Sequence, residues 1–171
     1  MSKLQPEKND SDRLREALLD QLRYFVEEVD HLASMLGGIP ESVFEARPHP
    51  DSRSIKELYG RIAYYDEAIR LPGIRRMVEE DNPNLSTSDA GDAEAWNDLP
   101  MKDLLIRLKS ARLQLVAGVE ALFPADWSRR ARWDEVDLDV YGVVHAMIQQ
   151  DVDWLRTISY RLYGVRIPSR S

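Results

Sequence analysis

Residues 138–163 read LDVYGVVHAMIQQDVDWLRTISYRLY, and this stretch indicates the fold class. Its apolar residues recur at steps of three and four, which is the period of one face of an α-helix. One acid, Asp151, interrupts the apolar row. The stretch therefore predicts a long amphipathic helix ending near Gly164, and its inner face would carry Val140, Val144, Ile148, Asp151, Leu155, Ile158 and Leu162.

Three further stretches show the same helical period, namely residues 12–36, 54–70 and 100–122. The second begins with a capping box, because the Ser54 hydroxyl and the Glu57 carboxylate can each accept from the other's backbone N–H. Leu71-Pro72-Gly73 is predicted to end that helix. No stretch shows the alternation that is typical of a β-strand.

Four amphipathic helices predict an all-α, four-helix bundle, since each helix must bury its apolar face against the others. The long connection between the second and third helices is enough chain to cross the bundle, so these two helices can run parallel. We expect residues 1–171 to form a single domain, with residues 1–11 as a flexible tail and residues 81–98 as an acidic loop.

The composition, with 43% hydrophobic and 31% charged residues among 171, is typical of a soluble globular domain. There are no cysteines, which excludes disulfides, thiolate metal sites and cysteine nucleophiles. We expect no contact with a membrane and a cytoplasmic location, because the chain has neither a long apolar run nor the apolar core of a signal peptide.

The net charge of −7 comes from one segment, since 23 of the 30 acids balance the 23 Lys and Arg residues. The other seven acids lie in a stretch without a base: Glu79, Glu80, Asp81, Asp89, Asp92, Glu94 and Asp98. A nucleic-acid-binding protein would show a basic stripe instead, so we expect no nucleic-acid partner. The acidic segment is interpreted as a solvated surface, with a contact to a basic protein as the alternative.

The chain has only three histidines, His31, His49 and His145, and no His-x-x-x-His pair of the kind that binds zinc on a helix. One Glu-x-x-His sequence occurs, from Glu28 to His31. Di-iron helical bundles need that spacing on two helices, so a solvated pair is the simpler interpretation. His145 is expected to be a packing residue.

Two motifs resemble those of the DinB-like superfamily of four-helix proteins. The segment Arg53-Ser54-Ile55-Lys56-Glu57-Leu58-Tyr59-Gly60-Arg61-Ile62 is similar to the family's helix cap followed by Gly-His-Leu, and Gln150-Asp151-Val152-Asp153-Trp154 is similar to its His-Asp-x-x-His. The resemblance implies a four-helix bundle over residues 12–163. It also implies that the family's three metal-binding histidines correspond to Arg61, Gln150 and Trp154.

Arginine and the tryptophan indole have no lone pair to offer a metal, and glutamine is a weak neutral ligand. We therefore expect no metal and no other cofactor at these positions. One hypothesis places the charge of Arg61 where the metal would lie, with Asp151 as its partner and Tyr65 and Met147 on the pocket face. Such a pocket suits a small carboxylate or an aromatic ligand. The alternatives are a surface Glu57–Arg61 pair and, for Asp151, a buried anchor or a catalytic base.

Three functions follow from these observations. The first is a DinB-like protein without the metal site that binds a small ligand, or none, with no catalytic residue assigned. The second is a metal-dependent transferase or hydrolase with atypical ligands such as His145, Asp151 or Asp153. The third is a protein-interaction module that uses the acidic loop. A homodimer is compatible with each of them.

Overall fold

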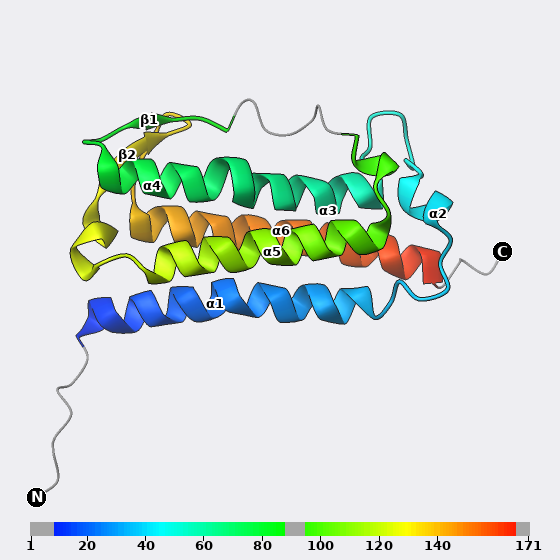
Figure 1. The fold of residues 1–171 in the computed structure, drawn as a ribbon. Coiled ribbons are helices and arrows are strands. Elements are labelled where there is room, and N and C mark those ends of the chain that lie inside the picture. The colour runs from blue at the N-terminus through cyan, green and yellow to red at the C-terminus, as the bar shows by residue number, and fades with distance from the viewer. Residues whose placement is uncertain (1–8, 88–94, 167–171) are drawn as a thin grey trace, which may run out of the picture.

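The computed structural model describes residues 9–87 and 95–166, and it confirms the expected four-helix bundle (Figure 1). Three of the four rods are single helices, and the second is built from three consecutive helical segments. The rods are α1 (Asp10–Ala33), then α3 (Ile55–Tyr64), η1 (Tyr65–Arg70) and α4 (Leu71–Glu79) in series, then α5 (Met101–Glu120) and α6 (Val140–Arg166). A short helix, α2 (Glu41–Glu45), follows α1.

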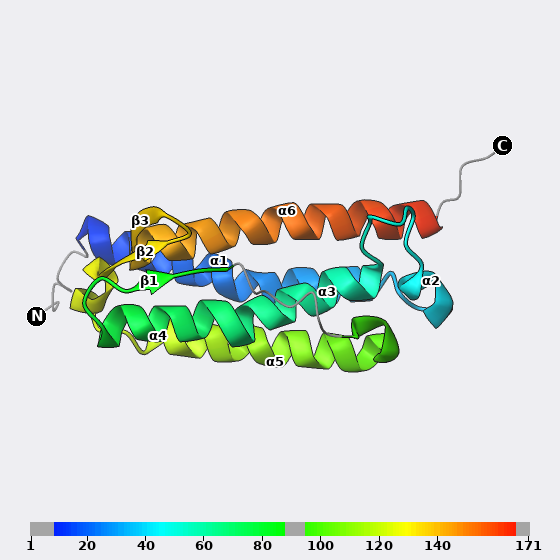
Figure 2. The same cartoon turned by 90° about the horizontal axis from the view of Figure 1, so that it is seen from above.

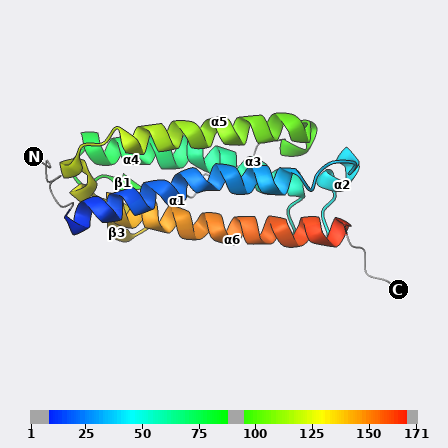
Figure 3. The same cartoon turned by 90° about the horizontal axis from the view of Figure 1, so that it is seen from below.

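In the bundle, α5 packs against α1 and α3, and α6 packs against the same two helices. Figures 2 and 3 show the resulting arrangement from above and from below. The chain runs in the same direction through α3–α4 and through α5, as Figure 1 shows by colour. This confirms the prediction that the long connection lets the second and third rods run parallel.

The second rod is longer than the sequence predicted, since α4 continues it from Leu71 to Glu79. The expected stop at Leu71-Pro72-Gly73 was wrong because the preceding segment, η1, is a π-helix. Its wide turn lets the N–H of Leu71 donate to the carbonyl oxygen of Asp66, five residues earlier. Pro72 then lies in the first turn of α4, directly after this wide turn, and the rod continues through it.

The absence of strands was also a wrong prediction. A three-stranded sheet, in the order β1 (Asn84–Leu85), β2 (Arg130–Trp133), β3 (Val136–Asp139), lies where α4 ends and α6 begins (Figure 2). β1 is parallel to β2, and β2 is antiparallel to β3. The hairpin turns at Asp134 and Glu135, which both have positive φ, as a two-residue primed turn requires.

The predicted capping box is present at the start of α3. Ser54 Oγ accepts from the N–H of Glu57 at 3.0 Å, and the N–H of Ser54 donates to Glu57 Oε2 at 2.7 Å. Lys56, in the first turn of the same helix, is buried, and its ammonium pairs with Glu41 and Glu45 of α2 at 2.7 and 2.8 Å. These contacts fix α2 against the beginning of the second rod.

Two glycines of the second rod lie under tryptophans from other elements. A Cβ on Gly60 would come within 2.2 Å of the Trp96 ring, and one on Gly73 within 2.3 Å of the Trp133 ring. Both rings therefore approach the backbone of the rod more closely than any other residue at these positions would allow. Trp133 thereby holds the β2–β3 hairpin against α4.

The apolar interior forms two clusters. The first includes Leu22, Leu115 and Ile148, and the second includes Phe25, Leu108 and Leu155. In three of the four rods, buried charged residues separate the two clusters along the chain: Asp66 and Arg70 of η1, Arg112 of α5 and Asp151 of α6. We call these four residues the charged layer. Every residue of the predicted inner face of residues 138–163, including Asp151, is buried.

Across residues 9–87 and 95–166, no helix is both long enough and apolar enough to cross a bilayer. Three of the acids in the predicted acidic loop, Asp89, Asp92 and Glu94, lie outside the described residues, as does most of the predicted tail.

Candidate functional site

The charged layer is a closed set of two arginines and two aspartates. Arg70 Nη1 donates to Asp66 Oδ1 and to Asp151 Oδ1, both at 2.8 Å. Arg112 donates through Nε to Asp66 Oδ2 at 2.7 Å and through Nη1 to Asp151 Oδ2 at 2.8 Å. Burial disfavours the charged form of Arg112, but the two carboxylates outweigh this effect and raise its pKa. The layer is therefore formally neutral, with each charge matched.

Aromatic rings complete the surroundings of both guanidinium groups. The Arg112 Cζ atom lies 3.7 Å from the centre of the Phe25 ring. The Arg70 Cζ atom lies 5.1 Å from the Trp154 ring centre and 6.0 Å from that of Tyr65. Cations over ring faces are attracted by the ring quadrupole, so these contacts help to hold both arginines inside the bundle.

A pocket of about 440 Å³ opens beside Arg70, between η1, the β2–β3 hairpin and the first half of α6. Its walls are mainly apolar, formed by Trp133, Val136 and Leu138 of the hairpin and by Val143, Ala146 and Met147 of α6. Its floor is polar, formed by the buried Tyr65 and Arg70 and the half-buried Gln150, and its rim carries Thr87 and Asp134. We call this cavity the Arg70 pocket.

The residues predicted from the sequence divide between the pocket and its surroundings. Tyr65, Met147 and Gln150 line the pocket, whereas Arg61, Asp151 and Trp154 do not. Two of these three nevertheless contact Tyr65, since Arg61 Nη2 donates to its hydroxyl at 3.1 Å and the Trp154 ring packs edge-to-face against it, with centroids 5.0 Å apart. Asp151 belongs to the charged layer.

The expected partner of Asp151 was Arg61, but the structure gives both carboxylate oxygens of Asp151 to Arg70 and Arg112. The surface alternative also differs, because Glu57 pairs with Arg47. Arg70 further donates through Nη2 to Gln150 Oε1 at 2.9 Å. The cation that contacts Asp151, Gln150 and Trp154 is therefore Arg70. The sequence analysis did not select this residue.

The comparisons with known proteins agree with this architecture. The sequence profile of the DinB superfamily matches residues 13–158. The chain belongs to the DinB superfamily. No curated protein matches it. The solved structure of YfiT from Bacillus subtilis, described as a probable metal-dependent hydrolase with an unusual four-helix bundle topology, superimposes with a TM-score of 0.71. It shares 10% sequence identity, and the match covers 96% of this chain and 93% of YfiT.

A metal ion needs ligands with available lone pairs, and the side chains at the three positions that the sequence resemblance assigns to the family's histidines do not fit this requirement. Arg61 and Trp154 can only donate hydrogen bonds, and the Oε1 atom of Gln150 is occupied by Arg70. Within residues 9–87 and 95–166, no group of three His, Asp or Glu side chains is placed to hold a metal ion. All three histidines are exposed, which corrects the expectation that His145 packs in the interior.

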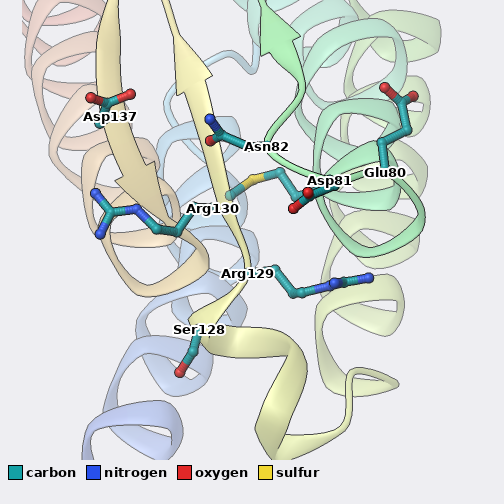
Figure 4. A pocket seen from close by; sticks show the side chains of 8 residues that line it. Glu80, Asp81, Asn82, Ser128, Arg129, Arg130 and Asp137 are labelled. Carbon is teal, nitrogen blue, oxygen red and sulfur yellow. The ribbon is translucent and has the colours of Figure 1, made fainter.

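A second hollow, of about 350 Å³, lies at the end of α4 beside β2 and β3 (Figure 4). It mixes acids with Arg129 and Arg130, and Figure 4 shows these side chains projecting from separate elements around it. Several of its groups already have partners, since Glu80 pairs with Arg76 and Arg129 donates to the carbonyl oxygen of Val78. The Arg70 pocket, with its apolar walls and small polar floor, is the stronger candidate.

Proposed function

We propose that this chain is a metal-independent member of the DinB superfamily that binds a small organic molecule in the Arg70 pocket. One observation carries the proposal. The Arg70 guanidinium is hydrogen-bonded to Gln150 and lies over the ring of Trp154, and the sequence resemblance assigns these two positions to metal-binding histidines of the family. An organic cation thus contacts two of the three side chains that the resemblance assigns to the metal site.

The charges around Arg70 also disfavour a metal ion at this position. A divalent cation beside Arg70 would be repelled by the positive charge of its guanidinium group. The two carboxylates that could attract such an ion, Asp66 and Asp151, are both paired with two arginines. Releasing either one would leave a buried charge without a partner, which is costly.

The pocket itself has the features of a small-molecule site. Its volume falls within the usual range for ligand cavities, which is about 300–1,000 Å³. Apolar walls supply binding free energy through burial, and the few polar groups of the floor supply orientation.

The two other functions have weaker support. The description of YfiT as a probable metal-dependent hydrolase favours an enzyme. However, the three residues that would have to bind the metal lie in different surroundings. His145 is exposed, Asp153 pairs with Arg156 at the surface, and Asp151 is buried in the charged layer. For an interaction module, the three acids Asp89, Asp92 and Glu94 lie outside the described residues.

Metal independence is tested by elemental analysis of protein purified with nickel, zinc and manganese present, together with thermal unfolding in each metal. A specific metal at 100 times its Kd stabilises a protein by about 2.7 kcal/mol, which at this chain length raises Tm by about 5–10 °C. We expect no stoichiometric metal and no such rise. A bound metal at one per chain, or a rise of that size, would overturn the proposal.

Ligand binding is tested with an environment-sensitive, uncharged naphthyl ketone dye as the probe. We expect saturable binding with one site per chain. The variant Ala146→Trp places an indole at the pocket wall, on a residue that is itself exposed, and should abolish binding. The matched control is His145→Trp, which adds the same ring at an exposed neighbour that does not line the pocket. Equal binding by both variants would place the dye elsewhere and refute the assignment.

A further inference from the structure

The geometry points to the class of ligand: an uncharged, mainly apolar molecule that carries a hydrogen-bond acceptor, such as a carbonyl oxygen. This inference rests on the proposed function, because it concerns the same pocket. It also replaces the sequence-based expectation of a carboxylate ligand. Three features of the Arg70 pocket support it: the balance of its charges, the direction of its hydrogen-bonding groups and the apolar character of its walls.

The charge balance disfavours an anion. Arg70 is the cation of the floor, but its charge is already matched by Asp66 and Asp151. Among the residues that the structure describes, the other charged side chain that lines the pocket is Asp134, which is negative. An entering carboxylate would therefore lose its hydration without gaining an unmatched cation, which is unfavourable in a mainly apolar site.

A cationic ligand is disfavoured as well. Within residues 9–87 and 95–166, Asp134 is the lining carboxylate that it would meet, and Asp134 already accepts from the N–H of Thr87 at 2.9 Å and from its hydroxyl at 2.6 Å. Asp134 is also exposed at the rim, where an ion pair contributes little. At the floor, the same ligand would approach the guanidinium of Arg70.

The hydrogen-bonding groups of the floor are donors. Arginine can only donate, so the Gln150 atom that contacts Arg70 Nη2 must be the amide oxygen, and this fixes the orientation of the amide. The other end of the Gln150 side chain is then its N–H₂ group, for which no described residue provides an acceptor. Tyr65 accepts from Arg61, which leaves its hydroxyl hydrogen for a further acceptor. A ligand oxygen satisfies these donors, whereas a ligand N–H group does not.

The experiment compares four naphthalenes of the same shape with different polar groups: 2-acetylnaphthalene, 2-naphthoate, 2-(aminomethyl)naphthalene and 2-ethylnaphthalene. Their affinities are measured by displacement of the naphthyl ketone dye. We expect the ketone to bind at least about tenfold more tightly than the anion and the cation, and several-fold more tightly than the hydrocarbon. Preference for the carboxylate, or equal affinity for the ketone and the hydrocarbon, would overturn the inference.

The variant Gln150→Glu tests the donor directly. One carboxylate oxygen still accepts from Arg70, while the amide N–H₂ is replaced by a second acceptor of the same size. We expect the ketone to lose about tenfold in affinity, with the hydrocarbon changed much less. The control is Gln149→Glu, the same change at an exposed neighbour, which should leave both affinities unchanged. If none of the four compounds binds in a way that Ala146→Trp abolishes, the proposed function itself fails; binding with the wrong preference refutes only the ligand class.

Discussion

The substitution Arg112→Met tests whether the charged layer stabilises the fold. Arg112 is fully buried, and methionine has a similar length without charge or hydrogen-bond donors. The change removes the bonds at 2.7 and 3.3 Å to Asp66 and the one at 2.8 Å to Asp151, together with the contact on the Phe25 ring. It leaves two buried carboxylates to share the single charge of Arg70.

The expected loss follows from these contacts. Removing one partner of a buried ion pair costs about 3–5 kcal/mol, since the remaining charge is buried without compensation. The methionine side chain retains part of the apolar packing, so we expect a loss of about 4 kcal/mol in the free energy of unfolding. For a chain of this length, each kcal/mol lowers Tm by about 2–4 °C, which gives a fall of about 8–16 °C.

The loss is measured by urea unfolding followed by circular dichroism. The control is Lys109→Met, one turn earlier on α5, which removes a surface pair with Asp30 at 2.7 Å and should cost less than about 1 kcal/mol. The double variant Arg112→Met/Asp151→Asn removes one charge of each sign and should lose less than the sum of the two single changes. If Arg112→Met costs no more than Lys109→Met, the charged layer does not stabilise this bundle.

Three other changes have expected outcomes. Gly73→Ala should lower Tm by several degrees and weaken dye binding, because the new methyl group displaces Trp133 from the pocket wall; unchanged binding would contradict this. Glu135→Gly should raise the free energy of unfolding by about 0.5–1 kcal/mol, since φ is +68° there, and calorimetry would measure it. The hydrogen bond from Lys56 lowers the pKa of Glu41 below 4.5, so its stabilisation is complete above pH 4.5 and is lost as the pH falls through the folded pKa. Lys56→Met should therefore remove this part of the acid sensitivity in unfolding curves between pH 3 and 6, and an unchanged pH profile would contradict the assignment.

The helical part of the fold was predictable because burial imposes one period on each long stretch. The inner face of residues 138–163 was predicted completely, and so was the capping box at Ser54. The β2–β3 hairpin was missed because its strands have only four residues each and its turn, Asp134-Glu135, lacks the usual Asn-Gly. One signal was present: β2 alternates Arg-Ala-Arg-Trp, and the alanine and tryptophan are the buried residues.

The candidate site was predictable in position but not in its charges. Asp151 was noticed because it interrupts an apolar row, and the same reasoning applies to Arg112, which lies between Leu108 and Leu115 on the buried side of α5. Asp66 and Arg70 are four residues apart, a spacing that sequence reasoning assigns to surface pairs more often than to buried ones. Their burial depends on the shape of the second rod, which local sequence signals do not reveal.

The π-helical segment η1 explains why Arg70, and not Arg61, reaches the centre of the site. The buried residues Ile62, Asp66, Arg70 and Ile74 follow one another at steps of four. In a regular α-helix each step of four advances the direction of the side chain by about 40° beyond a full turn, so three such steps would carry it off the inner face. The wider turn of η1 absorbs this drift and keeps Asp66 and Arg70 inside. The proposed role of Arg70 in the pocket therefore depends on the local geometry of η1 as well as on the side chains around it.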